Sequence, residues 1–404
     1  MSKKSNTVVF ASESPTEMYV EALHSLLSEG KDVAPRGKSI KELRPVIFEN
    51  HNPLRRVTFA KGRVINPFFQ LAESLWILAG RADVAWLTQY NASMANFSDD
   101  GVHFNAPYGE RLRYWDKSSL HGQVDGEYLD QIEDIITKIQ LDPDTRQAIG
   151  VIYNPNFDHA NYRTLDRPCN MLLNFKLRDG KLDLNVYNRS NDLHWGVFGA
   201  NLAQFATIQE YVATRLGVEV GVYYQTTDSL HIYTDSYGHG ESAKMLEYYP
   251  EYKEDTISDD IFYTTIEPRM GQCHATARHL VSGGRSDIRK TLDMFFDYLD
   301  PQIFDNATYA SELSIGDFIR SMNHIDSYIR MSALAMAAYR CHKAKDSKNM
   351  LLLLKAMPNC SWKFSCLRFL YKSHGESVLS TLDGSSSVYA DPEVIQYIRR
   401  EETK

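Results

Sequence analysis

The side chain that could best act as a nucleophile is that of Cys169, within the segment LDRPCNMLLNF. It directly precedes an apolar run that is typical of a buried strand, where a cysteine is usually a small core residue. Two cations are close in the sequence, Arg167 two residues before the cysteine and Arg163 six before it. Nearby positive charge favours the thiolate, the nucleophilic form of cysteine. The segment therefore indicates either a core cysteine or a nucleophile.

Polar residues downstream could bind a nucleotide. Arg189 and Ser190 end a predicted strand, where a guanidinium fork and a hydroxyl could hold a phosphate or merely form a polar strand end. Asn201 starts an apolar helix; its amide could match O4 and N3–H of uracil or could cap the helix. His231 and Tyr233 alternate on a strand and so share a face. They could reach a sugar hydroxyl or satisfy the core.

The elements that must position these residues follow from hydrophobic periodicity. The first part of the chain predicts helices at 15–30, 66–80, 128–145 and 199–217, and strands at 148–153, 171–177, 181–188 and 218–227. Asp179-Gly180 is a strong hairpin signal. Beyond about residue 250 the pattern is helical, at 318–345, 350–357 and 391–400. We therefore expect a catalytic domain at 1–255 and a mainly helical extension at 256–404.

Bulk properties limit the classes of function. The 404 residues carry a net charge of −8, which argues against a general nucleic-acid or anionic-membrane surface. No apolar run reaches membrane-spanning length, and the start of the chain lacks the apolar core of a signal peptide. Five scattered cysteines without a CxxC motif indicate a reducing, cytoplasmic location and no metal. Cys273-His274 and Cys341-His342 lack a second pair at zinc-like spacing.

Taken in order, RPCN, RSND, GAN and DSLHIY resemble the thymidylate synthase superfamily, which includes viral pyrimidine hydroxymethylases. The similarity extends over roughly residues 45 to 240. LAESLWILAG resembles the segment with the family's catalytic glutamate, at Glu73, and NAPYGERLRYW the segment with its catalytic tyrosine, at Tyr108. NPLRRV resembles the N-terminal phosphate-binding segment, with Arg55 or Arg56. DPDTRQAIGVIYNP resembles the loop whose arginine, here Arg146, reaches the partner subunit's phosphate site.

The resemblance implies an α/β (α+β) fold with three layers, a mixed sheet and flanking helices. It also implies a homodimer that acts on a pyrimidine deoxynucleotide monophosphate with 5,10-methylenetetrahydrofolate as cosubstrate. Cys169 would add to C6 of the base, so that C5 can attack the one-carbon unit. Glu73 and Tyr108 would move protons. The residues expected to bind the nucleotide are Arg55, Arg56, Arg146, Arg189, Ser190, Asn201, His231 and Tyr233, and Asp192 and Gly196 are expected beside the folate.

Departures from the family pattern bear on the product. Asn170 replaces the histidine that follows the cysteine, Gln147 replaces the second of two arginines, and Met94 replaces a tryptophan near the transferred carbon. The turn GVFGAN is one residue longer than in the family. The chain ends YIRREETK, without the synthase's short apolar closing tail.

A more open site favours capture of water. We therefore expect a phage enzyme of the host cytoplasm that converts dUMP to 5-hydroxymethyl-dUMP. Thymidylate synthase, dCMP hydroxymethylase and an inactive member that serves as a binding protein are the alternatives.

Overall fold

The computed structural model describes residues 7–116, 128–159, 163–252, 287–301, 315–322, 327–358, 360–382, 395 and 398–399. The chain divides into two compact units. Unit 1 comprises Met1–Thr58 and Glu73–Glu254, and unit 2 comprises Phe59–Ala72 and Asp255–Lys404. A short segment from the first fifth of the chain thus groups with the C-terminal residues.

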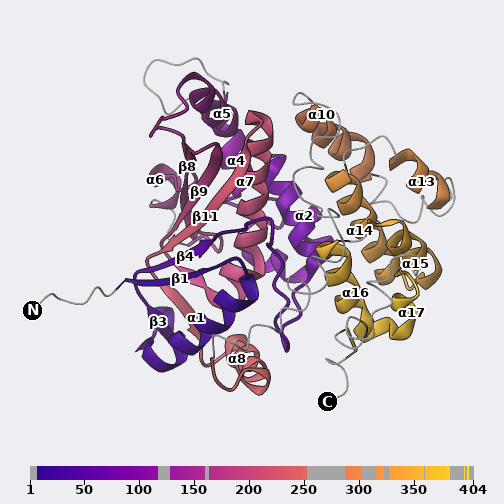
Figure 1. Ribbon diagram of the computed structural model, residues 1–404, viewed down its shortest axis with the longest axis horizontal. Helices are drawn as coiled ribbons and strands as arrows, with labels where there is room; N and C mark the ends of the chain where they lie inside the picture. Colours follow the sequence, from indigo (N-terminus) through magenta and orange to yellow (C-terminus); the bar gives the residue numbers. More distant parts are fainter. Residues whose placement is uncertain are drawn as a thin grey trace, which may run out of the picture. The chain divides into compact units, whose positions relative to one another are not determined.

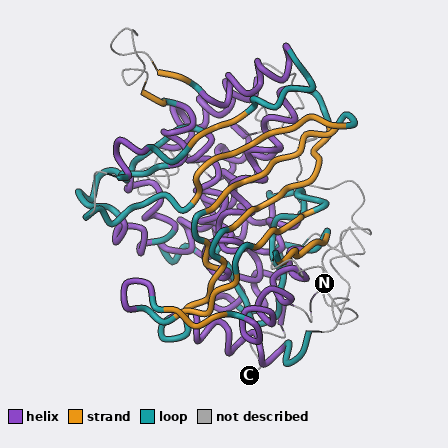
Figure 2. The backbone as a smooth tube through the Cα atoms, turned by 90° about the vertical axis from the view of Figure 1, so that its left-hand side faces the viewer, coloured by secondary structure: helices purple, strands orange, loops and turns teal. Residues whose placement is uncertain are grey.

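Unit 1 is built on a six-stranded mixed sheet, whose strands lie side by side in Figure 2. The strands, in spatial order, are β1 (Val8–Ser12), β4 (Val46–Asn50), β11 (Glu219–Thr227), β9 (Lys181–Asn188), β8 (Asn170–Arg178) and β7 (Ile149–Val151). β11 runs parallel to β9, whereas β8 and β9 form an antiparallel hairpin. Asp179 and Gly180 both have positive φ, 51° and 75°, as the predicted two-residue turn requires.

Helix α7 (Leu202–Leu216) packs against β9 and β11 and buries one face of this sheet. Figure 1 shows α7 beside these strands. Side chains of β9 alternate as expected, because Leu182, Leu184 and Val186 are fully buried and the residues between them are partly exposed. The first three residues of the predicted helix at 199–217 belong to a π-helix, Leu193–Asn201, which leads directly into α7. The other helices of unit 1 are α1 (Pro15–Glu29), α2 from Glu73 onward (Pro67–Leu78 in all), α3 (Val84–Tyr90), α4 (Tyr108–Arg113), α5 (Gln131–Leu141), α6 (Pro155–Asp158) and α8 (Tyr237–Tyr248).

Two small sheets complete unit 1. The first has the order β10 (Asn191–Asp192), β12 (Leu230–Tyr233), β3 (Ile40–Leu43) and β2 (Lys31–Val33). In its parallel β10–β12 pair Asp192 lies opposite His231, so two predicted site segments are joined by backbone pairing. The second sheet pairs β5 (Trp115–Asp116) with β6 (Tyr128–Leu129).

The regular elements described in unit 2 are helices. The unit contains α10 (Asp287–Met294), α13 (Ile315–Ser321), α14 (Ser327–Lys343), α15 (Ser347–Ala356), α16 (Ser361–His374) and α17 (Glu376–Leu379). The segment Phe59–Ala72 contributes aromatic rings to its core, since Phe68 stacks on Tyr339 and Phe59 packs against Phe364. The helix predicted at 391–400 lies mostly outside the described residues, as does Cys273.

The expected fold class is confirmed, with mixed sheets, flanking helices and a helical C-terminal region. The periodicity analysis missed the four N-terminal strands β1 to β4, which are only three to five residues long. Within the described part of the chain, none of the helices combines the length and apolar character needed to cross a bilayer.

Candidate active site

Cys169 lies immediately before β8 and is held against the end of β9 by Arg189. The Arg189 backbone N–H donates to the Cys169 carbonyl at 3.1 Å, and its Nε donates to the Pro168 carbonyl at 2.9 Å. Its Nη2 then lies 3.7 Å from the Cys169 Sγ. Cys169 is partly exposed and unbonded to other cysteines. The hairpin predicted from sequence therefore brings the candidate nucleophile and the candidate phosphate ligand together.

Arg36 is a site residue that sequence reasoning missed. It has φ 54°, a left-handed conformation that is uncommon outside glycine, and its side chain is exposed. Arg36 hydrogen-bonds with Tyr233, and its charge acts on the Cys169 thiol. The segment APRGKS, in which an arginine precedes a turn glycine, was the available signal.

Opposing effects act on the pKa of Cys169. Burial is the largest effect and raises the pKa of the thiol, the positive charges of Arg189 and Arg36 lower it, and the carboxylates of Asp166 and Asp192 raise it. The two arginines near Cys169 in the sequence, Arg163 and Arg167, are exposed. The cations that favour the thiolate are thus supplied by other parts of the fold.

The candidate sugar ligands share a face of β12, as their spacing predicted. The rings of His231 and Tyr233 are 5.4 Å apart and nearly perpendicular. Ser190 is partly exposed between β9 and β10. Asp192 accepts hydrogen bonds from the Trp195 backbone N–H at 2.6 Å and the Tyr237 hydroxyl at 2.7 Å. Its carboxylate therefore caps the following π-helix and is already engaged on both oxygens.

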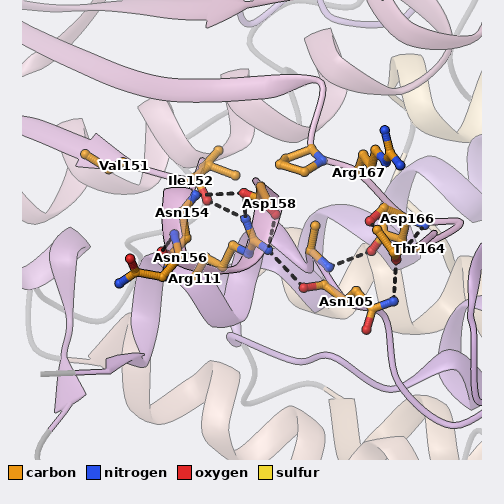
Figure 3. Close-up of polar contacts among 12 residues, drawn as sticks. Asn105, Arg111, Val151, Ile152, Asn154, Asn156, Asp158, Thr164, Asp166 and Arg167 are labelled. Carbon is orange, nitrogen blue, oxygen red and sulfur yellow. Dashed lines mark hydrogen bonds and ion pairs between the residues drawn. The ribbon is translucent and has the colours of Figure 1, made fainter. Parts of the chain in front are cut away.

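The loop that leads to Cys169 is fastened to the segment before α4 (Figure 3). The Ala106 backbone N–H donates to Asp166 Oδ2 at 2.7 Å, and the Asn105 side chain donates to Thr164 at 2.5 Å. Arg111 of α4 donates to the Asn105 carbonyl at 3.0 Å and forms a two-pronged ion pair with Asp158 at 2.7 and 2.9 Å. Because these contacts surround the start of α4, they fix Tyr108 relative to the cysteine loop.

Asn201 lies in a row of buried amides. Its Nδ2 donates to Asn191 Oδ1 at 3.2 Å, and its Oδ1 accepts from Asn170 Nδ2 at 3.4 Å. Asn188 Nδ2 in turn donates to Asn170 Oδ1. All four side chains are at least nine-tenths buried. Asn170, which replaces the family histidine, thus lies between the cysteine and the candidate base-reading residue.

Gly196 leaves room for this row. A Cβ at position 196 would lie 2.0 Å from Asn191 Oδ1, which no side chain could accommodate without moving Asn191. The structure gives Gly196 this packing role beside the amides, and its expected place beside folate stays a prediction.

Glu73 and Tyr108, the residues expected to move protons, both have a pKa that burial raises. Burial raises the pKa of Glu73 to about 7, although a hydrogen bond with Gln204 acts in the opposite direction, and the Glu73 Oε2 is buried without a hydrogen-bond partner in the described residues. Burial also raises the pKa of Tyr108, whose hydroxyl group interacts with the side chain of Asn170 and the backbone of Cys169. Tyr108 stacks on Phe205 of α7. A carboxyl that titrates near neutral pH suits a general acid or base.

The three other expected arginines are Arg56, Arg55 and Arg146. Arg56 is 1% exposed and pairs with Glu210 and Thr207 within the core, so it cannot reach a nucleotide phosphate, and that expectation is wrong. Arg55 pairs with Glu13 at 3.1 Å. Arg146 is exposed on the turn between α5 and β7.

The described residues contain no cluster of three or more histidine, cysteine, aspartate or glutamate side chains suited to a metal ion. The candidate site therefore comprises one thiol with two cations acting on it and a row of buried amides, and the buried acid Glu73 lies on α2.

These features define a class of enzyme, and the family comparison agrees. A family model described as thymidylate synthase matches residues 19–267. This chain belongs to the thymidylate synthase family. Enzymes of this family transfer one-carbon groups and use methylenetetrahydrofolate as cosubstrate.

Three individual proteins are similar to this chain. A deoxyuridylate hydroxymethyltransferase of Bacillus phage SP01 is 46% identical over 400 residues, which cover 97% of this chain and 99% of the relative. A deoxyuridylate hydroxymethyltransferase of Pseudomonas phage M6 is 37% identical over 217 residues, or 53% of this chain and 58% of the relative. A putative thymidylate synthase of Methanosarcina acetivorans is 33% identical over 194 residues, or 46% of this chain and 82% of the relative. The likeness to the SP01 protein therefore includes the helical C-terminal region.

Proposed function

We propose that this protein is a deoxyuridylate hydroxymethyltransferase, which converts dUMP to 5-hydroxymethyl-dUMP with 5,10-methylenetetrahydrofolate as the one-carbon donor. The observation that carries the proposal is the contact between Arg189 and Cys169 at the head of the amide row. Near-complete coverage of a phage deoxyuridylate hydroxymethyltransferase supports the choice within the family.

The nucleotide is bound by groups at the ends of β9 and β12. Arg189 and Arg36 hold the 5′-phosphate, with Ser190 beside it, because guanidinium groups pair well with phosphate oxygens. His231 and Tyr233 hold the 3′-hydroxyl. Asn201 reads the base through one acceptor and one donor, which match N3–H and O4 of uracil.

Catalysis starts at the thiol. The Cys169 thiolate adds to C6, forming a C–S bond, and C5 becomes nucleophilic enough to attack the one-carbon unit that the folate supplies. A base then removes the C5 proton, and the amine of the folate departs, leaving an exocyclic methylene. Water adds to this methylene as hydroxide, and the thiolate leaves C6 to restore the double bond. Glu73, with a pKa near 7, accepts and returns these protons, aided by Tyr108.

The active assembly is a homodimer that pairs through the open face of the large sheet. This face carries partly or fully exposed apolar and aromatic side chains on several strands, including Val9 at 47%, Ile149 at 38% and Val151 at 37% exposure. Tyr187 and Tyr224 project from the same sheet between buried neighbours. Arg146, exposed at its border, completes the partner's phosphate site.

The free thiols Cys169, Cys341, Cys360 and Cys366 support a reducing compartment, the cytoplasm of an infected host cell.

One experiment tests the reaction. The purified protein is incubated with [5-³H]dUMP and methylenetetrahydrofolate, released tritium is counted, and the nucleotide product is weighed by mass spectrometry. We expect tritium release and a product heavier than dUMP by CH₂O. A gain of CH₂ alone would identify a thymidylate synthase. Absence of both release and mass change would overturn the proposal in favour of a binding protein.

A further inference from the structure

Asn201 and three neighbouring amides form a row of hydrogen bonds that all run in one direction. Asn188 donates to Asn170, Asn170 donates to Asn201, and Asn201 donates to Asn191. At one end the Thr227 hydroxyl donates to Asn188 Oδ1 at 3.5 Å. At the other end Asn191 Nδ2 is buried without a partner in the described residues.

The direction of these hydrogen bonds fixes the orientation of the Asn201 amide group. An amide oxygen has two acceptor sites and its NH₂ group has two donors. The row occupies one of each on Asn201 and leaves one acceptor and one donor for a ligand. If Asn201 alone rotated by 180°, its NH₂ would face the Asn170 NH₂ and its oxygen would face the Asn191 oxygen. Both pairings are unfavourable for buried groups, so Asn201 can reverse only if the row reverses.

We infer that Asn170 and Asn188 are positioning residues that select uracil over cytosine by locking the orientation of Asn201. Uracil offers N3–H beside O4, whereas cytosine offers N3 beside an amino group, so a reversed amide would match cytosine. The inference rests on the proposed function, because it takes the ligand to be a pyrimidine nucleotide. It assigns a selective role to the residue that replaces the family histidine.

Aspartate substitutions test the direction of the row without changing its shape. In Asn170→Asp the carboxylate cannot donate to Asn201 Oδ1, so the reversed orientation of Asn201 becomes favourable. Asn188→Asp acts indirectly. A carboxylate at position 188 can only accept, so Asn170 must rotate to donate to it, and Asn201 must then rotate as well. Asn191→Asp is the matched control, since this residue only accepts from Asn201 within the row. Asn191→Asp therefore keeps the original direction of the hydrogen bonds while it adds the same negative charge.

For each protein, kcat/KM is measured with dUMP and with dCMP, and the products are identified by mass. Binding of both nucleotides is measured separately by calorimetry without folate. We expect the dUMP-to-dCMP ratio to fall by roughly ten- to two-hundredfold in Asn170→Asp and Asn188→Asp, the usual range for leaving a base's polar groups unpaired. In Asn191→Asp the ratio should stay within about threefold of the unmodified protein.

An unchanged ratio in both Asn170→Asp and Asn188→Asp, or an equal fall in all three variants, would overturn the inference. Failure of the unmodified protein to convert dUMP would instead overturn the proposed function, whatever the variants do. If Asn170→Asp does not fold, which circular dichroism reports, Asn188→Asp together with its Asn191→Asp control decides the matter.

Discussion

The carboxyl group of Glu73 is buried, and its pKa is raised from 4.5 to about 7. Between these values the folded protein holds a proton that the unfolded chain releases, so the group lowers the stability of the fold as pH rises from about 4.5 past 7. Glu73→Gln removes this loss. At pH 8 the variant should be more stable by at most about 3 kcal/mol, and below pH 4.5 the difference should vanish.

Urea unfolding of both proteins at pH 4 and pH 8 checks this prediction. The activity of Glu73→Gln should fall at all pH values and lose the inflection near pH 7 in kcat/KM. If the variant and the unmodified protein are equally stable at pH 8, the Glu73 carboxyl is not desolvated.

The sulfur of Cys169 is the proposed nucleophile. Cys169→Ser should reduce turnover by roughly a thousandfold or more, because a hydroxyl is far less ionised than a thiol at neutral pH. Binding of dUMP, measured by calorimetry, should be nearly unchanged. Cys341→Ser makes the same atomic change in unit 2 and should retain full activity. A Cys169→Ser protein with a tenth of the normal rate would make Cys169 a structural residue.

Residue types and order predicted the thiol, the arginine beside it and the pair on β12, because each lies within a strand or directly beside one. Arg36 escaped because its position depends on a left-handed turn in a short irregular segment. Arg56 was misjudged because its sequence cannot show that Glu210, 154 residues later, neutralises it in the core. Ion pairs between residues that are far apart in the sequence cannot be predicted from a local pattern.

At the scale of elements, the π-helix Leu193–Asn201 depends on Gly196. Gly196→Ala should displace Asn191, destabilise the fold by about 1–3 kcal/mol and lower kcat/KM for dUMP. Gly240→Ala in α8 is the matched control, because a Cβ there meets nothing within 4 Å, and it should leave stability equal or slightly higher. Thermal denaturation and steady-state kinetics of the two variants provide the comparison. Equal stability of both would show that Asn191 can move freely.

Elements with several regular turns or alternating residues were predicted within a few residues; α1, β9 and β11 are examples. The predicted helix at 318–345 overlaps α13 and covers α14, and residues 323–326 between them lie outside the described part of the chain. The short strands β1 to β4 carry too few alternations to be recognised alone. Their pairing with distant strands, as between β4 and β11, is what defines them.

At the scale of the whole molecule, each active site of the proposed dimer contains residues of both chains. Cys169→Ser and Arg146→Ala proteins should each be nearly inactive alone. After mixing and subunit exchange, half of the dimers are mixed, and one of their two sites has both Cys169 and the partner's Arg146. Activity should therefore recover to about a quarter of normal.

Light scattering at micromolar protein should accordingly give twice the chain mass of 46.3 kDa. A monomer, or mixing without recovery, would contradict the assignment of Arg146. Two Cys169→Ser samples mixed with each other show that the exchange procedure by itself creates no activity.

The π-helix also governs how this chain can change in length. In an α-helix each added residue turns the preceding segment by about 100°, so an insertion would swing every earlier side chain out of place. A π-turn absorbs one residue as a local widening, here with the Leu202 backbone N–H donating to the Val197 carbonyl, five residues back. Helix α7 keeps its phase, so the fold can accommodate the extra residue that the sequence predicts in the GVFGAN turn. An insertion at this point therefore disturbs little of the surrounding structure. Residues that line the site can be added there while α7 and its buried face stay the same.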